Sequence, residues 1–206
     1  MKTVYLVRHC KYDNPRNIYP GRLPVQLSAE GMEQAERLRK YFAEKNIQKI
    51  SSSAVFRCKQ TSTIISDKNI PIQFDKRLLE TFSAYQGYWG ADFGKPEGWD
   101  EFYAHQAELG GEVYEDVQKR VLSFFHEMIQ GPEERVIICS HGDPLHFLYL
   151  GLKGSPLPDW KGDTGEYGNP DYLKKGYIRP LFIENNEYRF EPMITQDVLS
   201  GMFPSD

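Results

Sequence analysis

The segments KTVYLVRHC, residues 2–10, and RVIICSHG, residues 135–142, decide how the rest of the chain is interpreted. Each contains a short run of mostly apolar, β-branched or aromatic residues, as is typical of a buried strand. The first run ends at His9 and the second at His141. Because ligands gather beyond the carboxyl ends of the strands in an open parallel sheet, we expect both imidazoles at one edge of the fold.

Helix and strand patterns alternate outward from these two segments. Ser28 is a candidate N-cap, and the helix that follows it carries apolar residues at helical spacing, namely Met32, Ala35, Leu38 and Phe42. Further helices are expected at about 54–67, 112–129 and 142–152, and further strands at 49–51, 70–74, 177–184 and 188–190. This alternation predicts an α/β fold in three layers, in which helices cover both faces of a mostly parallel central sheet.

The length of 206 residues and the ordinary globular composition predict a single domain over 1–206 that buries a core of its own. The net charge of −4 gives no broad positive surface, so we expect neither nucleic acid nor a membrane as a partner. The sequence also offers no signal peptide or spanning helix. The odd number of cysteines, Cys10, Cys58 and Cys139, fits a reducing compartment, so we expect a cytoplasmic protein. The oligomeric state stays open.

Three stretches lack a regular pattern. Residues 80–111 are rich in aromatic side chains, which fits a lid or pocket wall and equally fits core filling. A loop rich in glycine and proline covers 154–176, and the tail over 191–206 has no assigned element. We expect substrate selectivity to lie in the first two stretches.

The residues next to the two histidines predict a site for a phosphoryl group. Arg8 precedes His9, and Arg57 opens the helix after the second strand. Guanidinium groups match phosphate oxygens in shape and charge, and a helix that begins at Gly142 would add backbone N–H groups. A neutral imidazole is also a nucleophile near pH 7, and its attack on phosphorus would give a phosphohistidine.

Such a reaction needs an acid that protonates the leaving oxygen, and two carboxyl groups are candidates. Glu80 follows the third strand region, and Asp143 follows His141-Gly142. Asp143 has an alternative role as the cap of the following helix. The cysteines and histidines show neither CxxC nor HExxH spacing, so we expect no metal site.

Five blocks of the sequence, in order, resemble the histidine phosphatase, or phosphoglycerate mutase-like, superfamily. They cover about residues 1–150: LVRH at 6–9, LSAEGMEQAERL at 27–38, SSAVFRCKQT at 52–61, LE at 79–80 with the GYWG segment at 87–90, and GE at 111–112 with Arg120 and the SHG that ends at Gly142. The resemblance implies that His9 is the phosphorylated nucleophile and that Arg8, Arg57 and His141 hold the phosphoryl oxygens. It also implies that Glu80 is the proton donor and that no cofactor is needed.

The chain departs from the family pattern next to His9. Cys10 stands where the family usually has glycine, which would put a side chain near the phosphate, and Tyr12 replaces a usual threonine. Lys11 stands where the family often has an acidic or neutral residue. It is either a solvated loop lysine or a partner for a second anionic group on the substrate.

These observations predict a metal-independent phosphomonoester hydrolase that acts on a phosphorylated small molecule. Three alternatives stay open: a phosphoglycerate mutase, a phosphatase of phosphoproteins, and a non-catalytic phosphate-binding module. The interval between Glu80 and His141 is short of the long insertion with which the family mutases close their site, which favours the hydrolase.

Overall fold

The computed structural model describes residues 1–88, 107–157 and 169–203. Within these ranges the strands form one six-stranded sheet in the order β3-β2-β4-β1-β5-β6. The strands are β1 (Lys2–Arg8), β2 (Lys49–Ser52), β3 (Ile72–Phe74), β4 (Arg135–Ser140), β5 (Ile178–Glu184) and β6 (Glu187–Phe190). The first four are mutually parallel, and β5 and β6 add an antiparallel hairpin at one edge.

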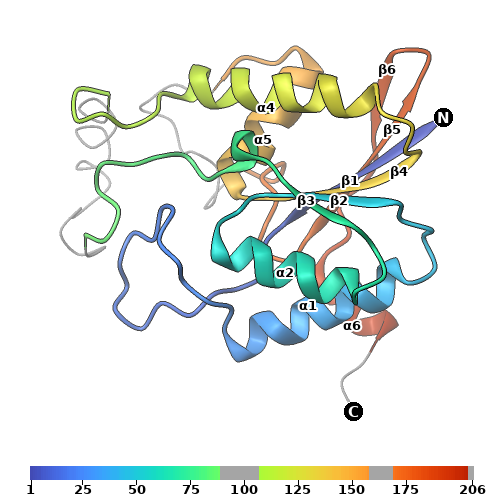
Figure 1. The fold of residues 1–206 in the computed structure, drawn as a ribbon, viewed down its shortest axis with the longest axis horizontal. Coiled ribbons are helices and arrows are strands. Elements are labelled where there is room, and N and C mark those ends of the chain that lie inside the picture. The colour runs from blue at the N-terminus through green and yellow to red at the C-terminus, as the bar shows by residue number, and fades with distance from the viewer. Residues whose placement is uncertain (89–106, 158–168, 204–206) are drawn as a thin grey trace.

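Helices lie on both faces of this sheet, so the predicted three-layer α/β fold is confirmed (Figure 1). One face carries α1 (Ala29–Phe42), α2 (Phe56–Ser66) and α6 (Gln196–Met202), and the other carries α4 (Tyr114–Ile129) and α5 (Gly142–Lys153). A short 3-10 helix, η1, covers Lys76–Leu78. In the described part of the chain, no helix combines the length and the apolar character that crossing a bilayer would require.

Strand β1 shows why two separate cores form. Side chains of a strand alternate between the faces of a sheet, so Tyr5 and Val7 point to the α1 and α2 side, whereas Val4 and Leu6 point to the α4 and α5 side. All four are buried. A strand that is covered on both faces carries a nearly continuous apolar run, which is the pattern that the sequence shows.

The pairing of β1 with β4 places the two histidines next to each other. Arg8 lies opposite Ser140 in the parallel register, and the backbone N–H of His9 donates to the carbonyl of Ser140 at 3.0 Å. His9 and His141 are therefore the residues that follow neighbouring strands at the same level. The register, rather than any contact between the rings, brings them together.

Some expected boundaries and faces are wrong. The third strand begins at Ile72 and not at residue 70, because the N–H of Ile70 donates to the carbonyl of Ser66 at the end of α2. The helix expected from residue 112 begins at Tyr114, since the N–H of Glu112 donates to Phe82 in the preceding loop. Met32 is 43% exposed, so it does not belong to the buried face of α1.

The expected hairpin turn and most of the tail lie in the described part of the chain, whereas parts of the two irregular loops do not. The hairpin turns at Asn185-Asn186 as predicted, and both residues have positive φ, which asparagine tolerates well. Helix α6 lies within the tail that the sequence left unassigned. Most of the aromatic stretch, over 89–106, and part of the second loop, over 158–168, lie outside the described residues.

Replacing Phe125 tests the core between the sheet and α4. Its side chain is fully buried, so Phe125→Ala should lower the free energy of unfolding by about 3–5 kcal/mol, through lost burial and an unfilled cavity. The matched control is Phe56→Ala, since Phe56 is 42% exposed, and its loss should stay below about 1 kcal/mol. Urea denaturation followed by circular dichroism measures both, and equal losses would contradict the assigned core.

Candidate active site

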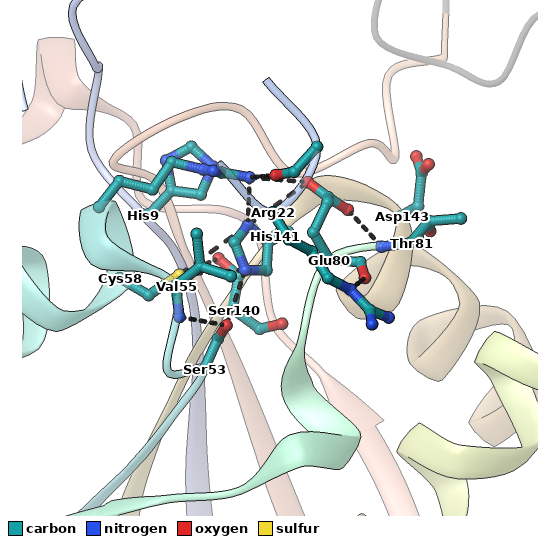
Figure 2. Close-up of polar contacts among 12 residues, drawn as sticks. His9, Arg22, Ser53, Val55, Cys58, Glu80, Thr81, Ser140, His141 and Asp143 are labelled. Carbon is teal, nitrogen blue, oxygen red and sulfur yellow. Dashed lines mark hydrogen bonds and ion pairs between the residues drawn. The ribbon is translucent and has the colours of Figure 1, made fainter. Parts of the chain in front are cut away.

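His9 and His141 lie with their rings close together at the carboxyl ends of β1 and β4. The ring centroids are 5.1 Å apart, and the planes are inclined at 62°. Both residues are almost completely buried, with 1% and 0% of their surface exposed. Figure 2 shows the two side chains converging on the same small region, which Glu80 enters from the other side.

The hydrogen bonds of His9 fix which of its nitrogens carries the proton. Nδ1 lies 2.8 Å from the carbonyl oxygen of Cys10, which can only accept, so Nδ1 is the donor. Nε2 lies 3.0 Å from Nε of Arg57, from which it accepts a hydrogen bond. The lone pair available for chemistry is therefore on Nε2, inside the site.

His141 is held in a complementary way. Its Nδ1 lies 2.9 Å from Nη2 of Arg57 and accepts a hydrogen bond from it. Its Nε2 lies 2.8 Å from the hydroxyl oxygen of Ser53, which also accepts the N–H of Val55 at 3.3 Å. Ser53 thus orients the ring, a role that the sequence interpretation missed although it quoted the block that contains Ser53.

Arg57 connects the two imidazoles. It lies in the first turn of α2 with 1% of its surface exposed. Besides both rings, its Nη2 contacts the carbonyl of Gly21 at 2.9 Å and a carboxylate oxygen of Glu80 at 3.3 Å. Among the described residues none accepts a hydrogen bond from its buried Nη1. That N–H is a donor available to an anion in the site.

Burial and the neighbouring cations keep both imidazoles neutral. Loss of hydration is the largest cause that holds the pKa of His9 well below its ordinary value, and the positive charges of Arg57 and Arg8 act in the same direction. The pKa of His141 is lowered in the same way, first by burial and then by Arg57. A neutral ring at position 9 keeps the Nε2 lone pair free of a proton at physiological pH.

Glu80 supplies a carboxylate at the edge of this pair. One oxygen lies 3.4 Å from Nδ1 of His141, and the other accepts the N–H of Thr81 at 3.0 Å. Its backbone carbonyl accepts Nε of Arg22 at 2.8 Å and Nη2 of Arg120 at 3.3 Å. Glu112 binds both of these arginines, so a partly buried ion-pair network fixes the backbone that presents Glu80.

Arg8, Gly142 and Asp143 come together around Tyr172. The Arg8 guanidinium lies over the Tyr172 ring, 5.4 Å from its centroid, and Nη1 donates to the carbonyl of Leu173 at 3.3 Å. The Tyr172 hydroxyl donates to Asp143 at 2.7 Å. A Cβ added at Gly142 would lie 2.1 Å from the same hydroxyl, so this position accepts no side chain.

The structure also shows whether Asp143 caps helix α5. Helix α5 has His141 at its N-cap position, so the expectation that Asp143 caps this helix is wrong. Asp143 lies instead in the first turn, where its negative charge interacts favourably with the helix dipole. Its carboxylate accepts a hydrogen bond from the Tyr172 hydroxyl. Glu80, by contrast, directly faces His141.

His9, Glu80 and His141 also have the spacing of a metal site. The ligand atoms of His9, Glu80 and His141 all lie within 4.8 Å of one another. The buried guanidinium of Arg57 contacts all three side chains, and its positive charge opposes a divalent cation and attracts an anion. The electrostatics of this cluster therefore favour a phosphoryl group over a metal ion.

The departures next to His9 have structural explanations. The Cys10 side chain belongs to the core on the α1 and α2 side, and its backbone N–H donates to the Thr61 hydroxyl, so the thiol does not occupy the phosphate region. Burial raises the pKa of this thiol, which keeps it unreactive. Lys11 is half exposed and forms an ion pair with Glu30.

Known proteins resemble this chain over most of its length. The model of the histidine phosphatase superfamily (branch 1) matches residues 4–167. A putative phosphoserine phosphatase 2 from Hydrogenobacter thermophilus is 30% identical over 165 residues, which is 76% of this chain and 81% of that protein. A probable phosphoglycerate mutase, GpmB, from Salmonella paratyphi A is 30% identical over 169 residues, 78% of each protein.

A solved structure shows the same fold. The structure of YhfR from Bacillus stearothermophilus superimposes with a TM-score of 0.79 at 24% identity, over 92% of this chain and 95% of that one. The family match covers most of the chain, and the matched range contains both histidines, Arg57 and Glu80. The chain belongs to the histidine phosphatase superfamily.

Proposed function

We propose that this chain is a phosphomonoester hydrolase that works through a phosphohistidine on Nε2 of His9. The observation that carries the proposal is the position of Arg57, whose N–H groups bridge the two neutral imidazoles while a carboxylate lies beside them. A nucleophile, cationic donors and an acid–base group are thus held in one buried site.

In the first step, the Nε–H of Arg57 moves from Nε2 to a phosphoryl oxygen, the freed Nε2 lone pair attacks phosphorus, and the bond to the leaving oxygen breaks. Arg57 Nε lies 3.0 Å from Nε2, so it borders any phosphoryl group that forms there, and Arg8 and the N-terminus of α5 with Gly142 add positive potential. The bound dianion favours a proton on Nδ1 of His141, which then donates to a phosphoryl oxygen. Glu80, here in its protonated form, gives its proton to the leaving oxygen and becomes a carboxylate.

In the second step, Glu80 acts as the base. Its carboxylate takes a proton from water, the water oxygen attacks phosphorus, and the bond between phosphorus and Nε2 breaks. Phosphate leaves, His9 regains its lone pair, and Glu80 is again protonated. His9 keeps its Nδ1 proton throughout, because the Cys10 carbonyl holds it.

We propose a phosphorylated small molecule as the substrate, since His9 and His141 are almost fully buried and a small ester reaches them more easily than a folded protein does. The name of the Hydrogenobacter relative, a phosphoserine phosphatase, supports this class. The three cysteines are free and buried, which supports a reducing compartment and hence the cytoplasm.

Replacing the nucleophile tests the mechanism directly. His9→Ala should lower kcat/KM for phosphomonoesters by at least about 10³-fold without added metal, because it removes the attacking atom. The wild type, quenched during turnover of a ³²P-labelled substrate, should carry an acid-labile label that the variant lacks. His126→Ala, on the exposed face of α4, is the matched control. Label that persists in His9→Ala would exclude the mechanism.

The role of Glu80 predicts a dependence on the leaving group. Glu80→Gln should lower kcat/KM for an alkyl phosphate by about 10²-fold or more and have much less effect on 4-nitrophenyl phosphate, whose leaving group needs no proton. Asp143→Asn is the matched control, and it should change kcat/KM for the two substrates by the same factor. The reverse pattern in steady-state assays would assign the acid to Asp143.

The lowered pKa of His9 and of His141 predicts how they titrate. A lowered pKa means that each ring gains its second proton only well below pH 6.5, so both should stay neutral from pH 8 to pH 6 in the substrate-free protein. Nitrogen chemical shifts of ¹⁵N-labelled histidine, followed from pH 8 to pH 6, measure this. Titration of His9 near pH 6.5 would contradict the assigned burial.

A further inference from the structure

The carbonyl of Cys10 holds the proton of His9, and a side chain of α1 holds the peptide group to which this carbonyl belongs. The N–H of the same peptide group, on Lys11, donates to the side-chain oxygen Oε1 of Gln34 at 2.9 Å. The carbonyl accepts from Nδ1 of His9 at 2.8 Å. Gln34, this peptide group and the His9 ring therefore form one continuous chain of hydrogen bonds.

The geometry of a peptide group couples the two contacts. Its atoms lie close to one plane, and in the trans form the N–H and the C=O point in nearly opposite directions. An acceptor that fixes the direction of the Lys11 N–H therefore also fixes the direction of the Cys10 carbonyl. Without Gln34, the peptide group would be freer to turn, and its carbonyl would hold Nδ1 of His9 less firmly.

Helix α1 approaches this part of the chain closely enough for Gln34 to reach it. A Cβ added at Gly31 would lie 1.8 Å from the carbonyl oxygen of Lys11, so a side chain at position 31 would push the two segments apart. The N–H of Ser28, the N-cap residue of α1, donates to the same oxygen at 3.1 Å. Gln34 lies one turn after Gly31 on the same buried face of the helix.

A different contact holds the peptide group on the other side of Cys10. The N–H of Cys10 donates to the Thr61 hydroxyl at 3.1 Å, and this hydroxyl donates to the carbonyl of Arg57 at 2.8 Å. That bond fixes the peptide group between His9 and Cys10. The direction of the Cys10 carbonyl, which belongs to the next peptide group, depends on Gln34.

The position of the proton decides which nitrogen of His9 attacks phosphorus. In the substrate-free site, Arg57 also opposes a proton on Nε2, because its Nε–H already points there. In the first step of the proposed reaction this N–H moves to a phosphoryl oxygen, and the hydrogen bond to the Cys10 carbonyl then keeps the proton on Nδ1. The same carbonyl faces the positive charge that the ring carries once Nε2 is phosphorylated.

We propose that Gln34 is a positioning residue, which acts through the peptide group between Cys10 and Lys11 to keep the His9 proton on Nδ1 and the lone pair on Nε2. The inference rests on the proposed hydrolase function and extends it to a buried side chain of α1. Gln34 acts on the reaction only through the ring of His9, so its loss should slow the chemical step without weakening substrate binding.

Gln60 provides a matched control for Gln34. It also lies on a helix, α2, and its side-chain oxygen also accepts a backbone N–H, that of Leu27 at 2.8 Å. Replacing either glutamine by methionine keeps the length of the side chain and removes the amide oxygen. The general cost of losing such a contact would appear in both Gln34→Met and Gln60→Met, whereas an effect on His9 would appear only in Gln34→Met.

The proton on Nδ1 of His9 gives a readout that does not depend on turnover. NMR of protein labelled with ¹⁵N-histidine measures its exchange with solvent at pH 8, and the signal is identified by its loss in His9→Ala. Gln34→Met should exchange this proton at least about tenfold faster than the wild type, because a hydrogen bond that holds the peptide group is lost. Gln60→Met should stay within about twofold. Gln34→Glu should retain slow exchange, since a carboxyl group keeps an acceptor oxygen in either protonation state.

The same variants separate kcat from KM with an alkyl phosphate as substrate. Gln34→Met should lower kcat about tenfold and leave KM within about twofold, because Gln34 orients the nucleophile. Gln60→Met should keep kcat within about twofold, and Gln34→Glu should restore most of the lost rate. Circular dichroism verifies that each variant is folded. If Gln34→Met unfolds, Gln34→Asn, whose amide is too short to reach the Lys11 N–H, takes its place.

Three results overturn the inference while the proposed function stands: wild-type exchange of the Nδ1 proton in Gln34→Met, equal effects of the two methionine variants, or faster exchange with an unchanged kcat. Failure of the proposed function gives a different result, because the wild type would then hydrolyse neither the alkyl phosphate nor 4-nitrophenyl phosphate. In that case, faster exchange in Gln34→Met alone still supports the control of the His9 proton by Gln34, and equal exchange overturns it.

Discussion

The parallel pairing of β1 with β4 is the constraint on which the site depends. Arg8 and Ser140 lie opposite each other, so His9 and His141, which follow them, lie at the same level. Side chains alternate along a strand, and a slip of one residue would send one imidazole to the other face of the sheet. The apolar alternation of Val4, Tyr5, Leu6 and Val7 between two different cores excludes that slip. Packing far from the chemistry therefore fixes the chemistry.

A buried positive charge is the second consequence of this arrangement. Arg57 loses its hydration inside the protein, and this cost is partly offset by contacts with Glu80, Gly21 and the two imidazoles. Because neutral rings accept its hydrogen bonds, a single carboxylate balances its charge at close range. The positive potential that remains attracts an anion and keeps the histidines unprotonated. The positive charge therefore contributes both to phosphate affinity and, after burial, to the neutral state of the nucleophile.

Much of the fold follows from local patterns in the sequence, and the site follows only in part. The apolar runs before His9 and His141 predicted two strands that end at one edge, and the helix that begins near Arg57 followed from its spacing. Met32 shows a limit of such patterns, since this apolar residue fits the helical spacing and is nevertheless exposed. Helix α6 has few apolar residues and is buried mainly through Leu199, so periodicity alone does not reveal it.

Individual hydrogen bonds and ion pairs between distant segments could not be predicted. Ser53 holds His141 through one hydrogen bond across 88 positions of the chain, and no local pattern in the sequence indicates that bond. Lys11 directly follows the motif residue Cys10 in sequence, and its pairing with Glu30 at the start of α1 is likewise not indicated by any local pattern.

The contact between Gly142 and Tyr172 constrains how this protein can evolve. Any residue with a Cβ at position 142 collides with the tyrosine hydroxyl, and a smaller residue at position 172 would leave Arg8 without its ring and Asp143 without its donor. Neither position can drift alone without loss, so the effect of each substitution depends on the residue already present at the other. An evolutionary path to another pair of residues here must pass through an impaired intermediate or acquire both changes together.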